Sequence, residues 1–272
     1  MIPVLTISGR SDGFGAQYYA CATGIAYARY KKYTYRHTPF KRLSHPHVTP
    51  EEFGLKPNRF LNLSQIFSIK MNEFCGLRSD SIDDPQNPVD INPGTGIMEE
   101  VSKSTRPDKY FTPKLKKYLR ELYFSTPKPP PCPYDVAIHV RRGDVTEHQY
   151  PHRYIPIEYY QNLITHFTEK KRGLTIGIYS DGDGQELSPL QSPNVTLCLG
   201  GDSTDAFHAL VTAPHLVITK SYFSFSAAIL SQNIIYSPSI TRKDLRDTRL
   251  DPYIDELKPL LGWRNLLLDK LP

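Results

Sequence analysis

The sequence predicts an α/β protein with two lobes, each built on a parallel sheet. Short apolar segments alternate along the chain with segments whose apolar residues recur at helical spacing. A proline-rich run over residues 127–133 separates two such regions, and a run of this kind makes a stiff interdomain linker. With 272 residues, 39% of them hydrophobic and 22% charged, the chain has a globular composition and can build one large core or two modest ones.

The first lobe is expected over residues 1–130. It begins with a βαβ-like unit, and a helix then begins at Thr112-Pro113, because proline is favoured in the first turn of a helix. In chain order, the expected elements are a strand over 2–8, a glycine-bearing loop over 9–17, a helix to about Tyr30, a strand over 33–37 and a long loop over 79–107.

The second lobe is expected over residues 134–250. Its alternating strands and helices are typical of a parallel, doubly wound sheet. Strands are expected at 135–140, 174–180, 196–199, 215–219 and 234–236, and helices at 157–168, 203–211 and 224–231. A tail over 251–272 is expected to contain helical pieces, interrupted by Pro259 and Gly262, that pack back across the lobes.

Composition narrows the function classes. The net charge of +5 is spread along the chain without a basic run, which suits an anionic small ligand and predicts no nucleic-acid partner. The longest apolar runs fall short of the roughly 20 residues that a membrane span requires. Because the sequence also shows no signal-peptide pattern, we expect a cytoplasmic protein whose four cysteines are free thiols.

The motif with the most chemical content covers residues 138–145, Ile-His-Val-Arg-Arg-Gly-Asp-Val. An apolar strand ends there in Arg141 and Arg142, at the edge of a parallel sheet where ligands bind. Guanidinium groups pair with phosphate oxygens, Gly143 allows a sharp turn, and Asp144 can hold one arginine in place. The motif therefore predicts a phosphate site, with a surface Arg–Asp pair that caps the strand as the alternative.

The string His-Val-Arg-Arg-Gly-Asp resembles the signature of the α1,2-fucosyltransferases and is similar to the equivalent motif of the α1,6- and protein O-fucosyltransferases. Residues 11–20 resemble the family's N-terminal loop and helix, and residues 218–228 resemble its Ile-Ser-Asn-Ser-Ser-Phe-Ser segment. Two positions depart from the family pattern: Ala16 replaces an asparagine, and Tyr222 replaces a serine.

The resemblance implies a GT-B-like fold, in which two Rossmann-like lobes enclose a cleft. It implies an inverting, metal-independent glycosyltransferase that moves L-fucose from GDP-fucose to a hydroxyl of a glycan or glycoconjugate. No cofactor and no metal are expected. The same fold with another nucleotide sugar, and a non-catalytic glycan- or nucleotide-binding homologue, remain alternatives.

The resemblance also implies roles for individual residues. It places His139 near the guanine or ribose and Arg141 on the β-phosphate, with Arg142 and Asp144 in support. A fixed arginine there would stabilise the charge that grows on the leaving phosphate, as a metal does in other glycosyltransferases. Gly13, Phe14 and Gly15 lie in the loop after the first strand, which makes them candidates for the interdomain cleft, with an ordinary tight turn as the alternative.

Two further groups complete the predicted donor site. The segment of Ser221, Tyr222, Phe223 and Ser224 lies between a strand and a helix, where amides and hydroxyls can bind pyrophosphate. A plain serine N-cap is the alternative. Asp205 lies where relatives keep an acid that contacts the nucleotide, or it is an acid favoured by the helix dipole.

The general base remains open among four candidates, Asp12, Asp144, Glu147 and His148. Asp181 and Asp183 form a D-x-D pair after a strand. We interpret the pair as a turn with a possible nucleotide contact rather than as a metal site. Three histidines at positions 37, 45 and 47 are interpreted as loop residues, because their spacing does not aim them at one ion.

Overall fold

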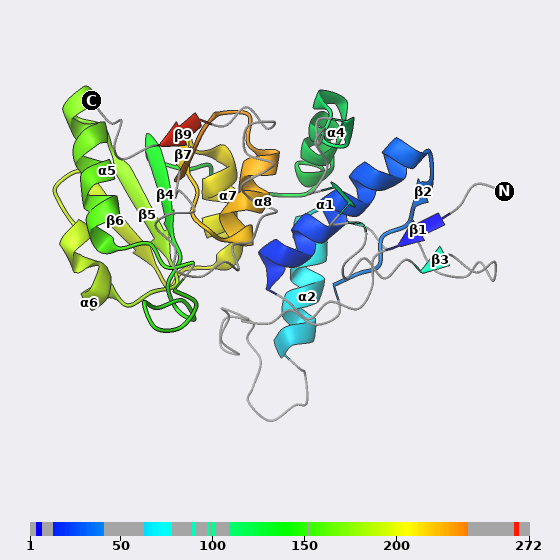
Figure 1. Ribbon diagram of the computed structural model, residues 1–272, viewed down its shortest axis with the longest axis horizontal. Coiled ribbons are helices and arrows are strands. Elements are labelled where there is room, and N and C mark those ends of the chain that lie inside the picture. The colour runs from blue at the N-terminus through cyan, green and yellow to red at the C-terminus, as the bar shows by residue number, and fades with distance from the viewer. Residues whose placement is uncertain are drawn as a thin grey trace. The chain divides into compact units, whose positions relative to one another are not determined.

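The computed structural model describes residues 4–6, 13–40, 63–77, 89–90, 97, 100–101, 109–151, 153–238 and 264–266. The chain divides into two compact units, Met1–Lys128 and Pro129–Pro272, and the boundary falls inside the proline-rich run. Both units are α/β, and each contains a parallel sheet (Figure 1).

The first unit contains a three-stranded sheet in the order β2-β1-β3, with both pairings parallel. The predicted βαβ unit is confirmed, since α1 connects two parallel neighbours. Thr112 accepts a hydrogen bond from the amide of Leu115 (3.2 Å) and caps α4 as expected. The elements are β1 (Val4–Thr6), α1 (Phe14–Lys31), β2 (Thr34–Tyr35), α2 (Leu63–Phe74), β3 (Val89–Asp90) and α4 (Pro113–Tyr123).

Two expectations for this unit were wrong. The loop predicted over 9–17 ends earlier, because α1 already begins at Phe14. The long loop predicted over 79–107 contains β3, which pairs with β1 through Leu5↔Val89.

The helix α1 contains several small residues, alanine, glycine and cysteine, and it is buried along most of its length.

The second unit contains a six-stranded sheet in the order β6-β5-β4-β7-β8-β9, and every pairing is parallel. This is the doubly wound order, in which the chain starts in the middle at β4 and builds outward first to one side and then to the other. The strands are β4 (Val136–Val140), β5 (Ile176–Ser180), β6 (Val195–Leu199), β7 (His215–Val217), β8 (Ile234–Pro238) and β9 (Arg264–Leu266).

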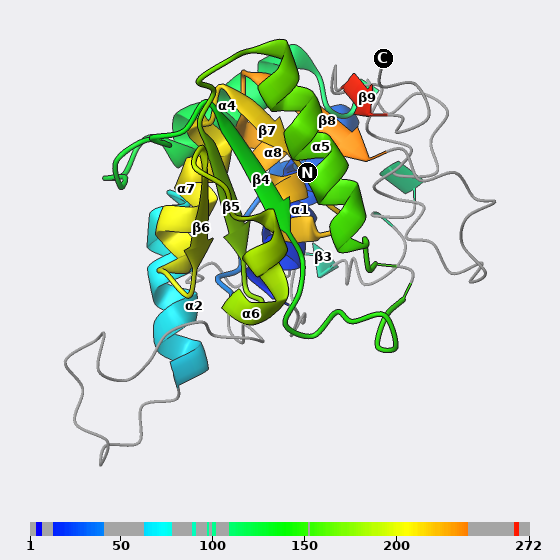
Figure 2. The same ribbon diagram turned by 90° about the vertical axis from the view of Figure 1, so that its left-hand side faces the viewer.

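The helices of the second unit lie on both faces of its sheet, with α5 on one face and α7 and α8 on the other (Figures 1 and 2). Alternate residues of β4, namely Val136, Ile138 and Val140, belong to the core that α5 covers. His139 therefore lies on the opposite face, where its ring meets that of Phe223. The helices are α5 (Ile157–Lys170), α6 (Gly184–Leu187), α7 (Ser203–Thr212) and α8 (Tyr222–Leu230).

The tail differs from its prediction at one point. Helical pieces were expected over 251–272, but Arg264–Leu266 forms β9, which extends the sheet by pairing with β8. The rest of the tail lies outside the described residues.

Candidate functional site

The topology of the second unit marks one edge of the sheet as a binding site. The strand order reverses between β4 and β7, and ligands of open α/β sheets bind outside the carboxyl ends of the strands at such a switch point. The loop after β4 carries Arg141–Asp144, and the loop after β7 leads into Ser221 at the start of α8. Two of the predicted donor-binding segments therefore flank the switch point.

A sharp turn brings the loop after β4 against the end of β5. Gly143 has φ of +63°, a conformation that side chains disfavour, and the amide of Val145 closes the turn on the carbonyl of Arg142 (3.1 Å). A Cβ at Gly143 would lie 2.9 Å from Oδ2 of Asp181. The predicted turn is confirmed, and it packs tightly on this carboxylate.

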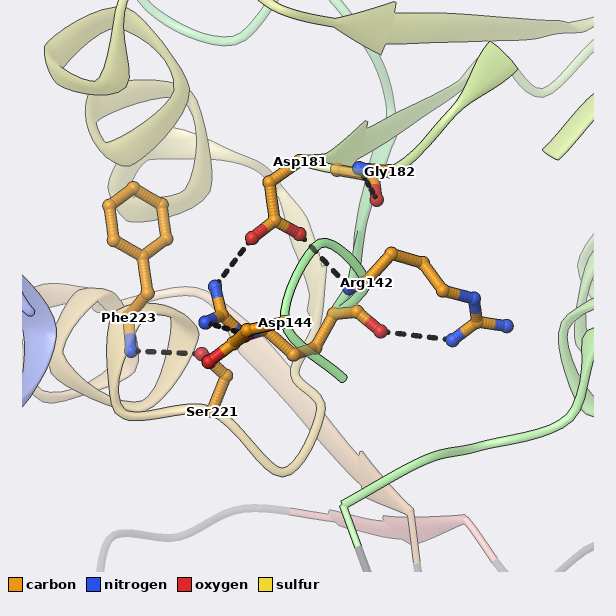
Figure 3. Close-up of polar contacts among 8 residues, drawn as sticks. Arg142, Asp144, Asp181, Gly182, Ser221 and Phe223 are labelled. Atoms are coloured by element: carbon orange, nitrogen blue, oxygen red, sulfur yellow. Dashed lines mark hydrogen bonds and ion pairs between the residues drawn. The ribbon is translucent and has the colours of Figure 1, made fainter. Parts of the chain in front are cut away.

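Asp181 organises both arginines of the motif (Figure 3). Its Oδ2 accepts a hydrogen bond from Nη1 of Arg141 (2.6 Å), and its Oδ1 accepts one from the backbone amide of Arg142 (3.0 Å). Nη2 of Arg141 pairs with Asp144, which confirms that Asp144 holds one arginine in place. Arg141 is thus a partly exposed cation fixed between two carboxylates.

Arg142 has a different role from Arg141, because its side chain is buried. It is 1% exposed, and its guanidinium pairs with Glu186 and donates to the carbonyls of Arg141 (2.9 Å) and Ile155 (3.0 Å). Its Cζ also lies 4.4 Å from the ring centre of Tyr154. Arg142, predicted among the donor-binding residues, therefore supports the loop from inside rather than facing a ligand.

The charges of the two arginines and their carboxylate partners determine how this cluster can bind an anion. Two arginines meet three carboxylates, those of Asp144, Asp181 and Glu186, so the free cluster has no surplus of positive charge. An anion that binds Arg141 competes with the carboxylates of Asp144 and Asp181 for its N–H groups. Asp144 has 25% of its side chain exposed against 15% for Asp181, so it is the partner that can move away.

His139 lies on β4, two residues before Arg141, with 5% of its surface exposed. Its Nδ1 has no hydrogen-bond partner among the described residues. Burial lowers the pKa of this imidazole to about 4; the charge of Asp181 opposes the shift and that of Arg141 adds to it. The ring is therefore neutral at ordinary pH and has one unused nitrogen, which a ligand can satisfy.

The hydroxyls at the start of α8 close the turn that leads into the helix. Ser221 accepts a hydrogen bond from the amide of Phe223 (3.3 Å), and the fully buried Ser224 accepts one from the amide of Thr219 (3.2 Å). Ser221 is thus an N-cap, which is the alternative weighed from the sequence. Tyr222 and Phe223 are half-buried in the first turn, beside this cap.

Two residues at the start of α7, its N-cap and its first residue, were missed from the sequence. Asp202 caps the helix, with its Oδ1 accepting from the amide (2.8 Å) and the hydroxyl (2.7 Å) of Thr204. Ser203 is buried, and its Oγ has no partner in the described part of the chain. Asp205, the predicted nucleotide contact, lies exposed in the first turn of α7. The Gly-Gly-Asp-Ser-Thr string before α7 is a helix-start signal that could have identified them.

The D-x-D pair serves two separate structural purposes. Asp181 binds the arginine motif, whereas Asp183 caps α6 by accepting from the amide of Gln185 (2.9 Å). The turn interpretation agrees with these contacts. In the described ranges, no three His, Cys, Asp or Glu side chains converge in a way that could hold a metal ion. Sequence reasoning gave no role to Glu186, which lies 44 positions from its partner Arg142.

The predicted site residues of the first unit are placed only in part. Asp12 lies outside the described residues. Gly13 is the N-cap residue of α1, Gly15 lies in its first turn, and Phe14 packs against the rings of Tyr18 and Phe40. Their predicted meeting with Arg141 in a cleft stays a prediction. Of the other base candidates, Glu147 and His148 are exposed.

His37 lies in the loop after β2, as interpreted from the sequence, and it has several side-chain contacts. It is buried, with Nε2 bonded to Oδ1 of Asn72 (2.8 Å) and Nδ1 near Tyr35 Oη (3.4 Å) and Cys21 Sγ (3.7 Å). Burial raises the pKa of the Cys21 thiol to about 12, so this Cys-His-Asn arrangement is an inert part of the core. His45 and His47 lie outside the described residues.

No family model matches the chain, and no curated protein matches it in sequence. Similar solved structures include NodZ α-1,6-fucosyltransferase co-crystallized with GDP, with 15% identity over 85% of this chain and 93% of that chain, and a TM-score of 0.39. NodZ is described as a fucosyltransferase from Bradyrhizobium.

Another similar structure is the E. coli heptosyltransferase WaaC with ADP, with 11% identity over 99% of this chain and 95% of that chain, and a TM-score of 0.47. The E. coli ADP-heptose LPS heptosyltransferase II has 11% identity over 96% of this chain and 99% of that chain, with a TM-score of 0.39. All of these TM-scores are below 0.5.

Proposed function

We propose that the protein is a GT-B-type glycosyltransferase that transfers L-fucose from GDP-fucose to a glycan hydroxyl, with inversion and without a metal ion. The observation that carries the proposal is the arrangement at the switch point of the second unit. There Arg141 is held by Asp144 and Asp181, in a motif that resembles the fucosyltransferase signature, beside the unpaired Nδ1 of His139.

The donor's pyrophosphate would bind Arg141 by replacing Asp144. The guanidinium of Arg141 then has an anionic partner both without the donor, from Asp144, and with it, from the pyrophosphate. The empty site therefore needs no surplus positive charge. Asp181 would stay in place, because its other oxygen is bonded to the amide of Arg142 and its side chain is the less exposed of the two. Arg141 would then contact the β-phosphate in a fixed orientation.

The nucleoside would lie against the α7 and α8 face of the sheet. His139 offers a neutral ring nitrogen there, and a hydroxyl of ribose or a polar edge of guanine can satisfy it. Ser203 offers a second unpartnered group, its Oγ, at the start of α7. Leaving these buried groups unpaired is unfavourable, so a ligand that pairs them gains affinity.

Transfer would proceed by attack of an acceptor hydroxyl on the anomeric carbon as the C–O bond to GDP breaks. Negative charge grows on the β-phosphate as the sugar leaves, and the fixed Arg141 would stabilise it. Asp144, displaced from Arg141 by the donor, would become a carboxylate with free oxygens near the reacting atoms. It could then accept the proton of the attacking hydroxyl.

Calorimetric titration of GDP tests the proposal. We expect GDP to bind in EDTA with an affinity that Mn²⁺ does not change, and GDP-fucose to bind comparably. UDP and ADP titrations at the same site give the matched comparison. Binding that appears only with Mn²⁺ would contradict the metal-free site, and preference for UDP or ADP would contradict the guanine assignment. Binding of GDP-fucose without release of GDP in the presence of glycan acceptors would instead favour a non-catalytic homologue.

A further inference from the structure

The first unit gathers exposed tyrosines and cations on one surface. Tyr30, in the last turns of α1, and Tyr118, on α4, are 43% and 38% exposed. Cζ of Arg29 lies 3.8 Å from the ring centre of Tyr118, which joins the end of α1 to α4 in one continuous surface. We call this surface the basic–tyrosine face and define its cations as Arg29, Lys31, Lys109, Lys114 and Lys117.

Among the residues that the structure describes, these five cations exceed the acidic groups that pair with them. Lys31 meets Glu100 (3.7 Å) and Lys117 meets Glu121 (3.8 Å), and both contacts are solvent-exposed and weak. Lys114 and Lys117 share the exposed side of α4 with Tyr118, because residues three and four apart are neighbours on a helix. The excess is invisible in the sequence, since the cations come from three separate segments.

Cations lie close to the tyrosine rings of this face. Nζ of Lys109 lies 4.9 Å from the ring centre of Tyr30 and 4.7 Å from that of Tyr110. Tyr27 stacks on Tyr110 with 6.3 Å between ring centres. Single-stranded nucleic acid binds by stacking its bases on open aromatic faces, and here a cation already lies against Tyr30 and against Tyr118. The surface therefore presents tyrosine edges and lysine heads rather than a stacking platform.

We propose that the basic–tyrosine face docks the protein onto an anionic lipid bilayer. Clusters of four to eight lysines and arginines bind such surfaces, and tyrosine is suited to the headgroup layer because it is apolar along the ring and polar at the tip. Lysine stems also remain compatible with lipid while the ammonium groups reach phosphate. Within the described residues, no helix is long and apolar enough to cross a membrane, so this contact is peripheral. The proposal goes beyond donor binding and does not depend on the identity of the nucleotide.

Sedimentation with sucrose-loaded vesicles tests the inference. We expect binding to vesicles of equal parts phosphatidylcholine and phosphatidylglycerol, little binding to phosphatidylcholine alone, and release by salt. The double variant Lys114→Glu and Lys117→Glu removes two exposed cations, and at about fivefold per cation it should lower the partition coefficient by at least about 25-fold. The matched control, Lys170→Glu with Lys171→Glu, makes the same charge change at the exposed end of α5 and should lower it far less.

A second variant pair separates the tyrosines from the charge. Tyr30→Ala with Tyr118→Ala keeps all five cations, and we expect weaker binding whose remainder is fully released by salt. Equal losses in the two lysine double variants would overturn the proposal, because binding would then follow net charge alone. Absence of vesicle binding at low salt, or tighter binding to an oligonucleotide than to the anionic vesicles, would overturn it too. GDP titration of each folded variant is the internal check, since the docking face should leave nucleotide affinity unchanged.

Discussion

Arg141 and Asp181 form an ion pair with 2.6 Å between Nη1 and Oδ2, although 40 positions separate them in the chain. Their strands are parallel neighbours, with Val140 opposite Ser180, so the two residues are the next pair after the strands end. The orientation of the arginine is therefore set by the loop that follows β5. Four predictions test what this geometry does.

The first prediction concerns Asp181→Asn. The amide keeps an oxygen for the N–H of Arg142 but removes the charge that aligns Arg141. We expect GDP affinity to be unchanged or tighter, because a carboxylate that repels the pyrophosphate is gone, while misplacement of Arg141 lowers kcat by about 100-fold. Steady-state kinetics and calorimetry measure the two effects. Asp183→Asn, in the same loop, is the control. Asparagine caps a helix about as well as aspartate, so this variant should keep both its stability and its kcat. Loss of GDP affinity in Asp181→Asn would contradict this account.

The second prediction is that Arg141→Ala lowers kcat by about 100- to 1,000-fold while donor binding weakens less, because charge builds on the phosphate mainly in the transition state. Arg141→Lys should recover only part of the loss, since lysine keeps the charge without the two-pronged contact. Turnover at saturating donor gives the answer. Near-normal kcat in the alanine variant would make this arginine structural.

Arg142→Ala is the matched comparison for that prediction. Its guanidinium is buried and donates to the carbonyls of Arg141 and Ile155, whereas its ionic partner Glu186 is exposed. We therefore expect a loss of about 1 to 3 kcal/mol in the free energy of unfolding, from the carbonyls left without a donor. Urea unfolding measures this loss, and Arg141→Ala should show a much smaller one. The reverse order of stabilities would mean that the roles of the two arginines are exchanged.

The third prediction separates backbone strain from crowding at Gly143. Gly143 and Gly173 have φ of +63° and +75°, but only at Gly143 would a Cβ meet a neighbour, at 2.9 Å from Asp181. Gly173→Ala should therefore lose about 1 to 2 kcal/mol from the left-handed backbone alone. Gly143→Ala should lose more and also reduce kcat, because Asp181 must shift. Thermal unfolding and kinetics of the two variants provide the comparison, and equal behaviour would argue against the tight fit.

The fourth prediction concerns pH. The pKa of His139 is lowered to about 4 in the folded state from an ordinary value near 6.5, so between these values the unfolded chain binds more protons. The free energy of unfolding should therefore fall as the pH drops from 6.5 toward 4, with His139 contributing at most about 3 kcal/mol, and this contribution should be constant above pH 7. His139→Gln removes the titration. The difference between its urea-unfolding profile and that of the native protein isolates His139 from His37, whose pKa is also lowered by burial. Parallel profiles would contradict the prediction.

The sequence predicted the strands of the second unit well because buried parallel strands are short apolar runs with distinct ends. β4 was expected at 135–140 and is found at Val136–Val140. β9 was missed for the opposite reason. It is three residues long and joins the sheet only by pairing with β8, so its local sequence carries no strand pattern.

The contacts within the site's own loop could be predicted from the sequence, but the contacts between residues distant in the chain could not. The Arg-Arg-Gly-Asp string indicated the turn at Gly143 and the pairing of Asp144 with an arginine, both of which are local. Burial of Arg142 was not predictable, because arginine is mostly exposed and its partner Glu186 is distant in sequence. The same distance hides the role of Asp181, which depends on the pairing of β4 with β5.

The segment between the two units is anchored closely on both sides. Nζ of Lys128 donates to the carbonyl of Phe74 (2.8 Å) in the first unit, and the amide of Cys132 donates to Thr212 Oγ1 (2.9 Å) in the second. Only three prolines, residues 129–131, lie between these anchors, and they have no N–H to bond elsewhere. Such a spacer adds about 9 Å of nearly inextensible length. Residues 129–131 thus act as a short rod rather than a tether, because the path length between the two anchors can change little.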